Sequence, residues 1–257
     1  MDHLQQLPRD ASGFRLRGVQ VTRLETFVDA AFAFSLTLLV IVTSDLPQTA
    51  AELHAALRKV PTFVACFAVL TMFWAAHNRW SRRVGLEDAT ATVLSLALVL
   101  VVMVYVYPLR MVTSSFLSLL TGGWLPNELG FEPARAMRDL QTTFIVYSLG
   151  FGLLAWLLWR LNAHALRQAD ALGLDANERH QLRTEVGSHA ILATVSLAAF
   201  LLALSLYVRD PALRGPMRAL GGLPMWCYAT LGLWMPWYHL RRERQRQAVS
   251  PPLDATA

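Results

Sequence analysis

Six long apolar blocks dominate the sequence and limit what the chain can fold into. About 20 helical residues cross the roughly 30 Å hydrocarbon core of a bilayer, and six segments reach that length: 22–44, 60–82, 89–109, 140–161, 187–208 and 218–240. Only 16% of the residues are charged and 54% are hydrophobic, whereas a soluble chain has about 25% charged residues. The sequence therefore predicts an all-α membrane protein with six transmembrane helices.

The 23 Lys and Arg residues indicate how these helices are oriented. Fifteen of them lie on the side of the predicted bundle that carries both termini, and eight lie on the opposite side. Positive charge accumulates in cytoplasmic loops, so we expect both termini in the cytoplasm. The net charge of +5 is then a topology signal, and we expect a lipid bilayer around the chain and no nucleic-acid partner.

The spans divide the chain into three regions. Residues 1–20 form a polar N-terminal tail, residues 21–241 the six-helix domain, and residues 242–257 a basic cytoplasmic tail. The last residues of that tail, 250–257, are expected to be disordered.

The segments between the spans are short. Thr49 and Glu52 have the spacing of a helix capping box, which predicts a short surface helix there. The third span is expected to continue past Pro108 to Leu120 as a kinked helix. Residues 162–186 are expected to form a polar cytoplasmic connector.

The first span carries an acid within an otherwise apolar helix. Asp29 should have a partner, because an acid at the centre of a membrane helix costs about 2.5–3.5 kcal/mol. At about 100° per residue, the helix has a second face about 110° away from Asp29. This second face, which we call the ridge, is formed by Arg23, Phe27, Ala30, Phe34, Thr37 and Ile41.

The end of the second span offers a partner for Asp29. One helix face there carries polar or amphipathic residues at i, i+3, i+4 and i+7, namely Trp74, His77, Asn78 and Ser81. Because the two spans are antiparallel neighbours, we expect His77 or Asn78 to donate a hydrogen bond to the carboxylate of Asp29. We favour a packing contact that joins the two helices. Direct contact of Asp29 with a permeating ion is the alternative.

These residues give the chain a family resemblance. Arg23, Phe27 and Asp29 resemble the signature Arg-x-x-x-Phe-Ser-Asp of the transmembrane protein 175 family, which comprises potassium channels of bacteria and lysosomes, and the stretches 36–41 and 73–83 extend the resemblance. The six spans and the cytoplasmic termini agree with the family over most of the chain. Val28 departs from the signature, because the family usually has serine there.

The resemblance implies a potassium channel of the bacterial inner membrane. It implies a homotetramer whose first helices line a central pore, with Phe34 at a hydrophobic constriction, Thr37 contributing to the preference for potassium, and Ile41 one turn beyond. All three lie on the ridge. The resemblance also implies a network of Arg23, Phe27, Asp29, Trp74, His77 and Asn78. Phe34 is a second departure, since the family usually has isoleucine or leucine, and ordinary helix packing is the alternative role of the ridge.

Other chemistry has little support in the sequence. No two histidines have the spacing with a nearby acid that a metal site on one helix requires, and there is no nucleophile elbow or phosphate loop. We therefore expect no enzyme, no metal and no cofactor, with a haem held between two spans as the less favoured alternative. Two other functions stay open: a non-conducting membrane scaffold of the same fold, favoured by Val28 and Phe34, and a proton-coupled transporter that uses Asp29.

Overall fold

The structure is a computed structural model of the chain that describes residues 6–41, 47–130, 135–209 and 220–249. In these ranges the regular structure is helical, apart from one isolated bridge between Arg9 and Arg15. The helices are α2 (Arg23–Ile41), α3 (Ala50–Leu57), α4 (Val60–Val84), α5 (Ala89–Leu120), α6 (Ala136–Arg167), α7 (Ala176–Arg209), α8 (Leu223–Ala229) and α9 (Leu231–Val249).

Four stretches of the described chain are long and apolar enough to cross a membrane. They are the α3–α4 segment and the helices α5, α6 and α7. The all-α membrane fold is therefore confirmed. Helix α2 coincides with the expected first span, whereas the expected sixth span is broken at Thr230 into α8 and α9. At this break the Thr230 hydroxyl donates to the Cys227 carbonyl over 2.6 Å, and Pro236, which lacks an N–H, follows in α9.

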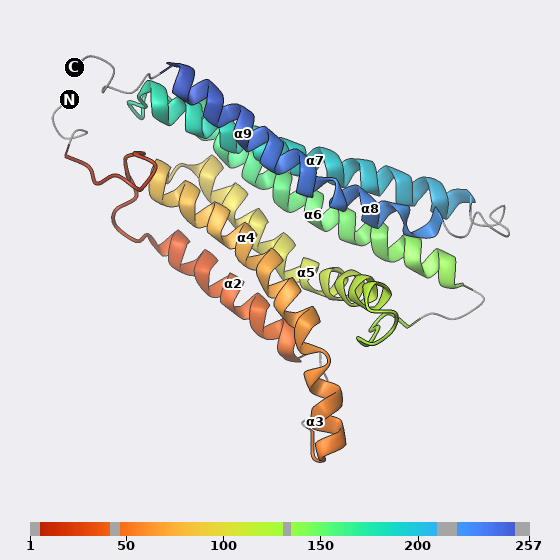
Figure 1. Cartoon of the computed structure of the whole chain (residues 1–257). Coiled ribbons are helices and arrows are strands. Elements are labelled where there is room, and N and C mark those ends of the chain that lie inside the picture. The colour runs from red at the N-terminus through yellow and green to blue at the C-terminus, as the bar shows by residue number, and fades with distance from the viewer. Residues whose placement is uncertain (1–5, 42–46, 131–134, 210–219, 250–257) are drawn as a thin grey trace, which may run out of the picture.

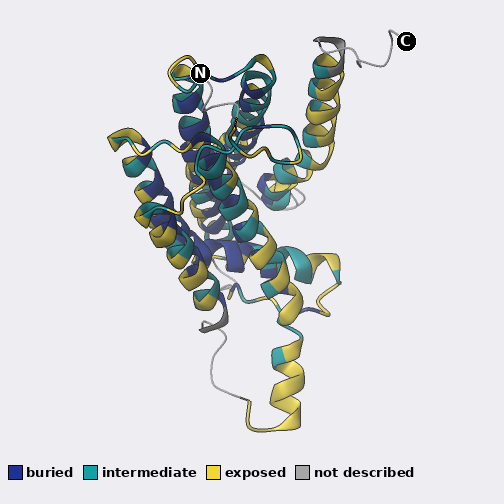
Figure 2. Cartoon of the chain, turned by 90° about the vertical axis from the view of Figure 1, so that its left-hand side faces the viewer, coloured by how far each residue is buried: buried dark blue, intermediate teal, exposed yellow. Residues whose placement is uncertain are grey.

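The helices pack as two groups joined along α5 and α6. Helix α2 packs on α4 and α5, while α7 packs on α6, α8 and α9. Figure 1 shows α2 at the outer edge of the bundle, with no helix of the same chain on its far side. Figure 2 shows α3 as an exposed helix that projects from the bundle, as expected for a surface helix. Its N-cap is Thr49, whose side chain accepts a hydrogen bond from the Glu52 N–H.

Three regions at or beyond the ends of the expected spans can be compared with the sequence-based expectations. Helix α5 does continue through Pro108 to Leu120. The expected connector 162–186 is mostly helical, because α6 runs to Arg167 and α7 begins at Ala176. The turn between α6 and α7 is made possible by Gly173, which has φ +59°. The basic tail is helical as far as Val249, and residues 250–257 lie outside the described residues.

The described part of the N-terminal tail is folded onto the bundle. Residues 8–17 form a loop closed by the Arg9–Arg15 bridge, and the side chain of Phe14 is completely buried. The loop lies at the end of the bundle that also carries the α6–α7 turn and the end of α9 (Figure 1). We call this the basic end. A polar tail was expected here because the segment has no apolar periodicity, but one buried aromatic residue and several ion pairs hold it.

Candidate functional site

Helix α2 has one buried face and one open face. The buried face is formed by Glu25, Val28, Phe32, Ser35 and Leu39. The described ridge residues all lie on the open face, and they are Arg23, Phe27, Ala30, Phe34 and Thr37. Phe27 and Phe34 are 54% and 50% exposed within the single chain. The ridge derived from helical periodicity is thus the face of α2 that its own chain leaves uncovered; the side chain of Ile41 lies outside the described residues.

Thr37 lies next to Phe34 on this face. Its hydroxyl donates a hydrogen bond of 2.7 Å to the Phe34 carbonyl. The hydroxyl proton is therefore directed along the helix, and the oxygen lone pairs of Thr37 stay available on the open side.

Asp29 is joined to α4 through Trp74. The indole N–H of Trp74 donates to the Asp29 carboxylate over 2.8 Å. His77 or Asn78 was the expected donor, but the buried imidazole of His77 shares a 3.0 Å hydrogen bond with Ser95 on α5. Asn78 is half-buried on α4. The polar face of α4 is thus divided between two neighbouring helices, and Trp74 is the residue of that face that satisfies the acid.

The first turn of α2 is fixed by a capping box that our reading of the sequence missed. The Glu25 N–H donates to the Thr22 hydroxyl over 3.1 Å, and the Thr22 N–H donates back to the Glu25 carboxylate over 3.0 Å. The second carboxylate oxygen of Glu25 accepts a 2.6 Å hydrogen bond from Ser81 on α4. The Thr-x-x-Glu spacing in the sequence is the signal that predicts such a box.

The far end of α2 is held by a buried arginine. The Arg110 guanidinium donates to the Leu39 carbonyl in the last turn of α2. It also forms a two-point ion pair with Glu128, in which Nη2 lies 2.7 Å from Oε1. Arg110 is one of the eight Lys and Arg residues counted in the sequence on the side of the bundle opposite the termini. Its position within the apolar helix that continues past Pro108 is the signal that it is buried and paired.

No group of three or more His, Cys, Asp or Glu side chains suited to a metal ion occurs in the described part of the chain. The two cysteines, Cys66 and Cys227, are free thiols. The candidate site consists of the open face of α2 and of the contacts that hold this helix: the Glu25 capping box, the Asp29–Trp74 hydrogen bond and the Arg110 contact.

Comparisons with known proteins point to one family. The family described as "Endosomal/lysosomal potassium channel TMEM175" matches residues 23–108, which contain α2, α4 and the first part of α5. A protein of Marivirga tractuosa named "Potassium channel" is 31% identical over 198 residues, covering 74% of this chain and 78% of the relative. A crystal structure of the potassium channel MtTMEM175, a threonine-to-alanine variant in complex with a Nanobody–MBP fusion protein, superposes with a TM-score of 0.72 and 26% identity. That match covers 91% of this chain and 100% of the other.

Proposed function

The chain belongs to the TMEM175 family of potassium channels, and from this premise we propose that it conducts potassium ions passively through a pore lined by the α2 helices of a homotetramer. The observation that carries the proposal is the uncovered ridge of α2. A membrane helix with one packed face and one row of exposed large side chains still needs a partner or a lipid on that row. Since α2 lies at the edge of its own chain (Figure 1), a central pore requires further copies of the chain.

Phe34 is proposed as the constriction. Its side chain is 50% exposed and stands in the middle of the ridge. Phenyl rings converging from several copies would form an apolar ring, and such a ring impedes ions by excluding the water that they carry. Because phenylalanine is larger than isoleucine or leucine, we expect slow conduction.

Thr37 is proposed as the residue that favours potassium over sodium, with Ile41 one turn further along. The Thr37 hydroxyl donates to the Phe34 carbonyl, so its oxygen lone pairs can face a cation that has lost part of its water shell. Oxygen ligands of this kind replace hydration water in ion-selective pores.

Asp29 is proposed to hold α2 in place and not to touch the ion. Its carboxylate accepts the Trp74 indole hydrogen bond, on a side of α2 away from Phe34 and Thr37. Of the expected network of Arg23, Phe27, Asp29, Trp74, His77 and Asn78, only the Asp29–Trp74 hydrogen bond joins α2 to α4 among the described contacts, because His77 bonds Ser95 on α5 and Arg23 and Phe27 lie on the open ridge. The basic end is proposed to face the cytoplasm of a bacterial inner membrane, because it carries the excess of arginine.

Potassium flux into liposomes tests the proposal. Phe34→Ala should raise potassium flux and weaken the preference for potassium over sodium, because the ring becomes wide and wet. Thr37→Val should lower the preference and leave the rate nearly unchanged, because it removes the hydroxyl and keeps the size. Phe67→Ala and Thr194→Val are the matched controls, since both residues are exposed on other helices, and neither should change rate or selectivity.

The same assay separates the alternatives. A scaffold that does not conduct would show no flux in any variant, including Phe34→Ala. A proton-coupled transporter would move potassium only with a proton gradient and would lose this dependence in Asp29→Asn. Unchanged rates and selectivity in both ridge variants of a conducting protein would show that the ridge does not line the pathway.

A further inference from the structure

We propose that residues 8–17 act as a clasp that positions the basic end of α2 for conduction, by tying the end of α4 to the start of α7. The inference rests on the proposed function, because its readout is potassium flux through α2. The clasp residues are positioning residues, and none of them lies on the ridge.

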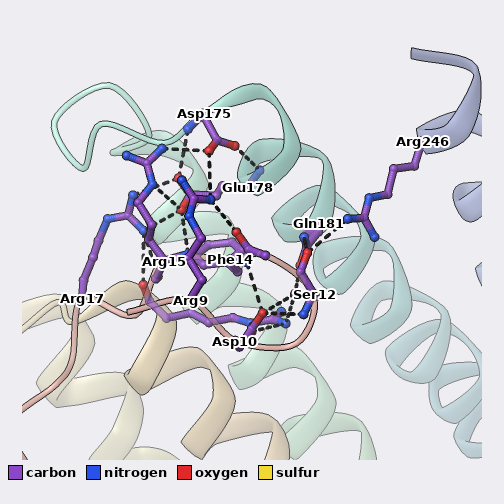
Figure 3. Close-up of polar contacts among 12 residues, drawn as sticks. Arg9, Asp10, Ser12, Phe14, Arg15, Arg17, Asp175, Glu178, Gln181 and Arg246 are labelled. Atoms are coloured by element: carbon purple, nitrogen blue, oxygen red, sulfur yellow. Dashed lines mark hydrogen bonds and ion pairs between the residues drawn. The ribbon is translucent and has the colours of Figure 1, made fainter. Parts of the chain in front are cut away.

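One grip of the clasp is on a buried carboxylate of α7. The Glu178 side chain has no exposed surface. It accepts the Arg15 N–H at 2.9 Å, the Arg15 Nε at 3.1 Å and the Arg17 Nη2 at 2.9 Å (Figure 3). Arg15 also reaches Asp175 at 2.8 Å. Glu178 also accepts the Asp175 N–H at 3.0 Å, but both of its ion pairs come from the two clasp arginines, so the buried charge is paired only while the clasp is docked.

The centre of the clasp is Phe14. Its side chain is completely buried, and its ring is contacted by the guanidinium of Arg17 at 5.7 Å from the centroid and by that of Arg83 at 5.0 Å. Here the ring joins the Glu178 grip to α4, because Arg83 belongs to the last turn of α4.

The other grip is on the end of α4. The Asp10 carboxylate pairs with Arg83 at 2.8 Å, and the Gly18 N–H donates to the Arg82 carbonyl over 3.0 Å. The backbone at Gly18 lies so close to α4 that a Cβ atom there would stand 2.6 Å from the Ser81 carbonyl oxygen. Directly after the clasp, the backbone at Gly18 therefore packs against Ser81, and Ser81 donates a hydrogen bond to Glu25 of α2.

Asp10 of the clasp and Asp175, which the clasp contacts next to the start of α7, stay charged at neutral pH. Partial burial raises the pKa of Asp10, but hydrogen bonds from Ser12 and Arg83 outweigh this effect and hold the pKa below its ordinary value. For Asp175 burial likewise raises the pKa, and hydrogen bonds from the Glu178 N–H and from Arg15 lower it further than burial raises it. The ion pairs therefore persist across the physiological range, and the clasp is a permanent tie.

The tie adds to other contacts between the two helix groups at the basic end, which include the hydrogen bond from the Trp80 indole N–H to the Leu161 carbonyl at 3.1 Å and the contact of His164 with Asp88 at 2.6 Å. Helix α7 packs on α6, α8 and α9, whereas α4 packs on α2, α5 and α6. The described ion pairs that join α4 directly to α7 are those of Arg79 and Arg83 with Glu185, at 3.4 and 3.7 Å. Residues 18–22 alone separate the clasp from α2, and the Gly18 N–H in this linker donates to the Arg82 carbonyl of α4. Ser81, the residue before Arg82, donates a hydrogen bond to Glu25 in the first turn of α2, so displacement of the clasp reaches α2 through the end of α4.

Three variants test the clasp in liposomes, after each assembled oligomer has been verified by size-exclusion chromatography. Phe14→Ala should reduce potassium flux at least about tenfold, because the ring that joins both grips is lost. Asp10→Asn should reduce it about threefold, because one ion pair is weakened while the loop keeps its shape. Arg244→Gln is the matched control, since Arg244 is an exposed residue at the same end, and its flux should stay within about twofold of the parent.

Rescue by crosslinking separates positioning from general damage. Ser12 and Gln181 touch at 2.7 Å, so cysteines at both positions, in a parent with Cys66→Ala and Cys227→Ala, accept a short bis-methanethiosulfonate crosslinker. In the Phe14→Ala background the crosslink should restore flux to within about twofold of the parent, and a reductant should abolish the rescue. If Phe14→Ala fails to assemble, the same rescue is measured in Asp10→Asn.

Hydrogen exchange distinguishes failure of the clasp from failure of the channel. Phe14→Ala should speed amide exchange in the first turn of α2, residues 23–27, and the crosslink should reverse this, whether or not the protein conducts. If the parent protein shows no potassium flux but Phe14→Ala still speeds exchange in residues 23–27, the proposed function is overturned and the clasp is supported. Assembled variants with parental flux and parental exchange overturn the clasp.

Discussion

Removing the positive charge of Arg110 should destabilise the far end of α2 strongly. In Arg110→Met the side chain keeps its length, but Glu128 loses its ion pair and the Leu39 carbonyl loses its donor. Breaking a buried pair costs about 3–5 kcal/mol. The side chains of Arg110 and Glu128 are 8% and 18% exposed, which favours the low end of that range. The hydrogen bond to Leu39 adds about 1 kcal/mol, so we expect a total of about 4 kcal/mol.

Thermal unfolding of the detergent-solubilised protein measures this effect. At about 2–4 °C per kcal/mol for a chain of this size, Arg110→Met should lower Tm by about 8–16 °C. Glu128→Gln should cost less, because the amide oxygen still accepts from the guanidinium. The double variant should be about 1–2 kcal/mol more stable than the sum of the two single effects predicts, because the two groups interact. Arg244→Met serves as the control with an unchanged Tm.

Two results would refute this reasoning about Arg110. A Tm within about 2 °C of the parent would show that the guanidinium stabilises nothing at the end of α2. Strict additivity of the single variants would show that Arg110 and Glu128 act independently and that their ion pair has no energetic role.

Two further predictions concern the basic end. Gly18→Ala should lower the free energy of unfolding by about 1–3 kcal/mol, because its Cβ would lie 2.6 Å from the Ser81 carbonyl oxygen. Gly222→Ala is the control and should leave Tm nearly unchanged, because open space surrounds Gly222. Equal changes of Tm in both variants would contradict the close approach at Gly18. Asp88 caps α5, and the hydrogen bond from the Ala91 N–H lowers its pKa to about 2 despite partial burial. The ionised carboxylate therefore stabilises the folded protein above pH about 4, and this stabilisation is lost as pH falls toward about 2. Asp88→Ala should cost about 1 kcal/mol at neutral pH, and Asp88→Asn should flatten the acid limb of a plot of Tm against pH; an acid limb identical to the parent's would contradict this role.

The ridge of α2 could be derived from the sequence because helical geometry alone fixes it. Once α2 is helical, Phe27, Phe34 and Thr37 must share a face, whatever packs around the helix. The structure confirms that this face is the one its own chain leaves open. The acid in the same helix was likewise detectable, because an unpaired carboxylate in an apolar helix is too costly to stay without a partner.

The sequence did not identify which residue donates the hydrogen bond to Asp29. The expected donor to Asp29 was His77 or Asn78, and the structure places Trp74 there, because the crossing of α2 and α4 decides which residue of a shared face reaches the acid. His77 turns instead to Ser95 on a third helix. Helical periodicity gives the face, but it does not give the rotation of one helix against another.

The sequence by itself determined the all-α membrane fold, the open ridge of α2 and the family, because these depend on local periodicity, hydrophobic length and short motifs. Only the tertiary structure decided that Phe14 and Glu178, separated by most of the chain, meet in one cluster, and that Arg110 closes the far end of α2. Such contacts depend on how the ends of different helices come together, and the free energy that selects them arises from burial and ion pairing between segments that no local pattern connects.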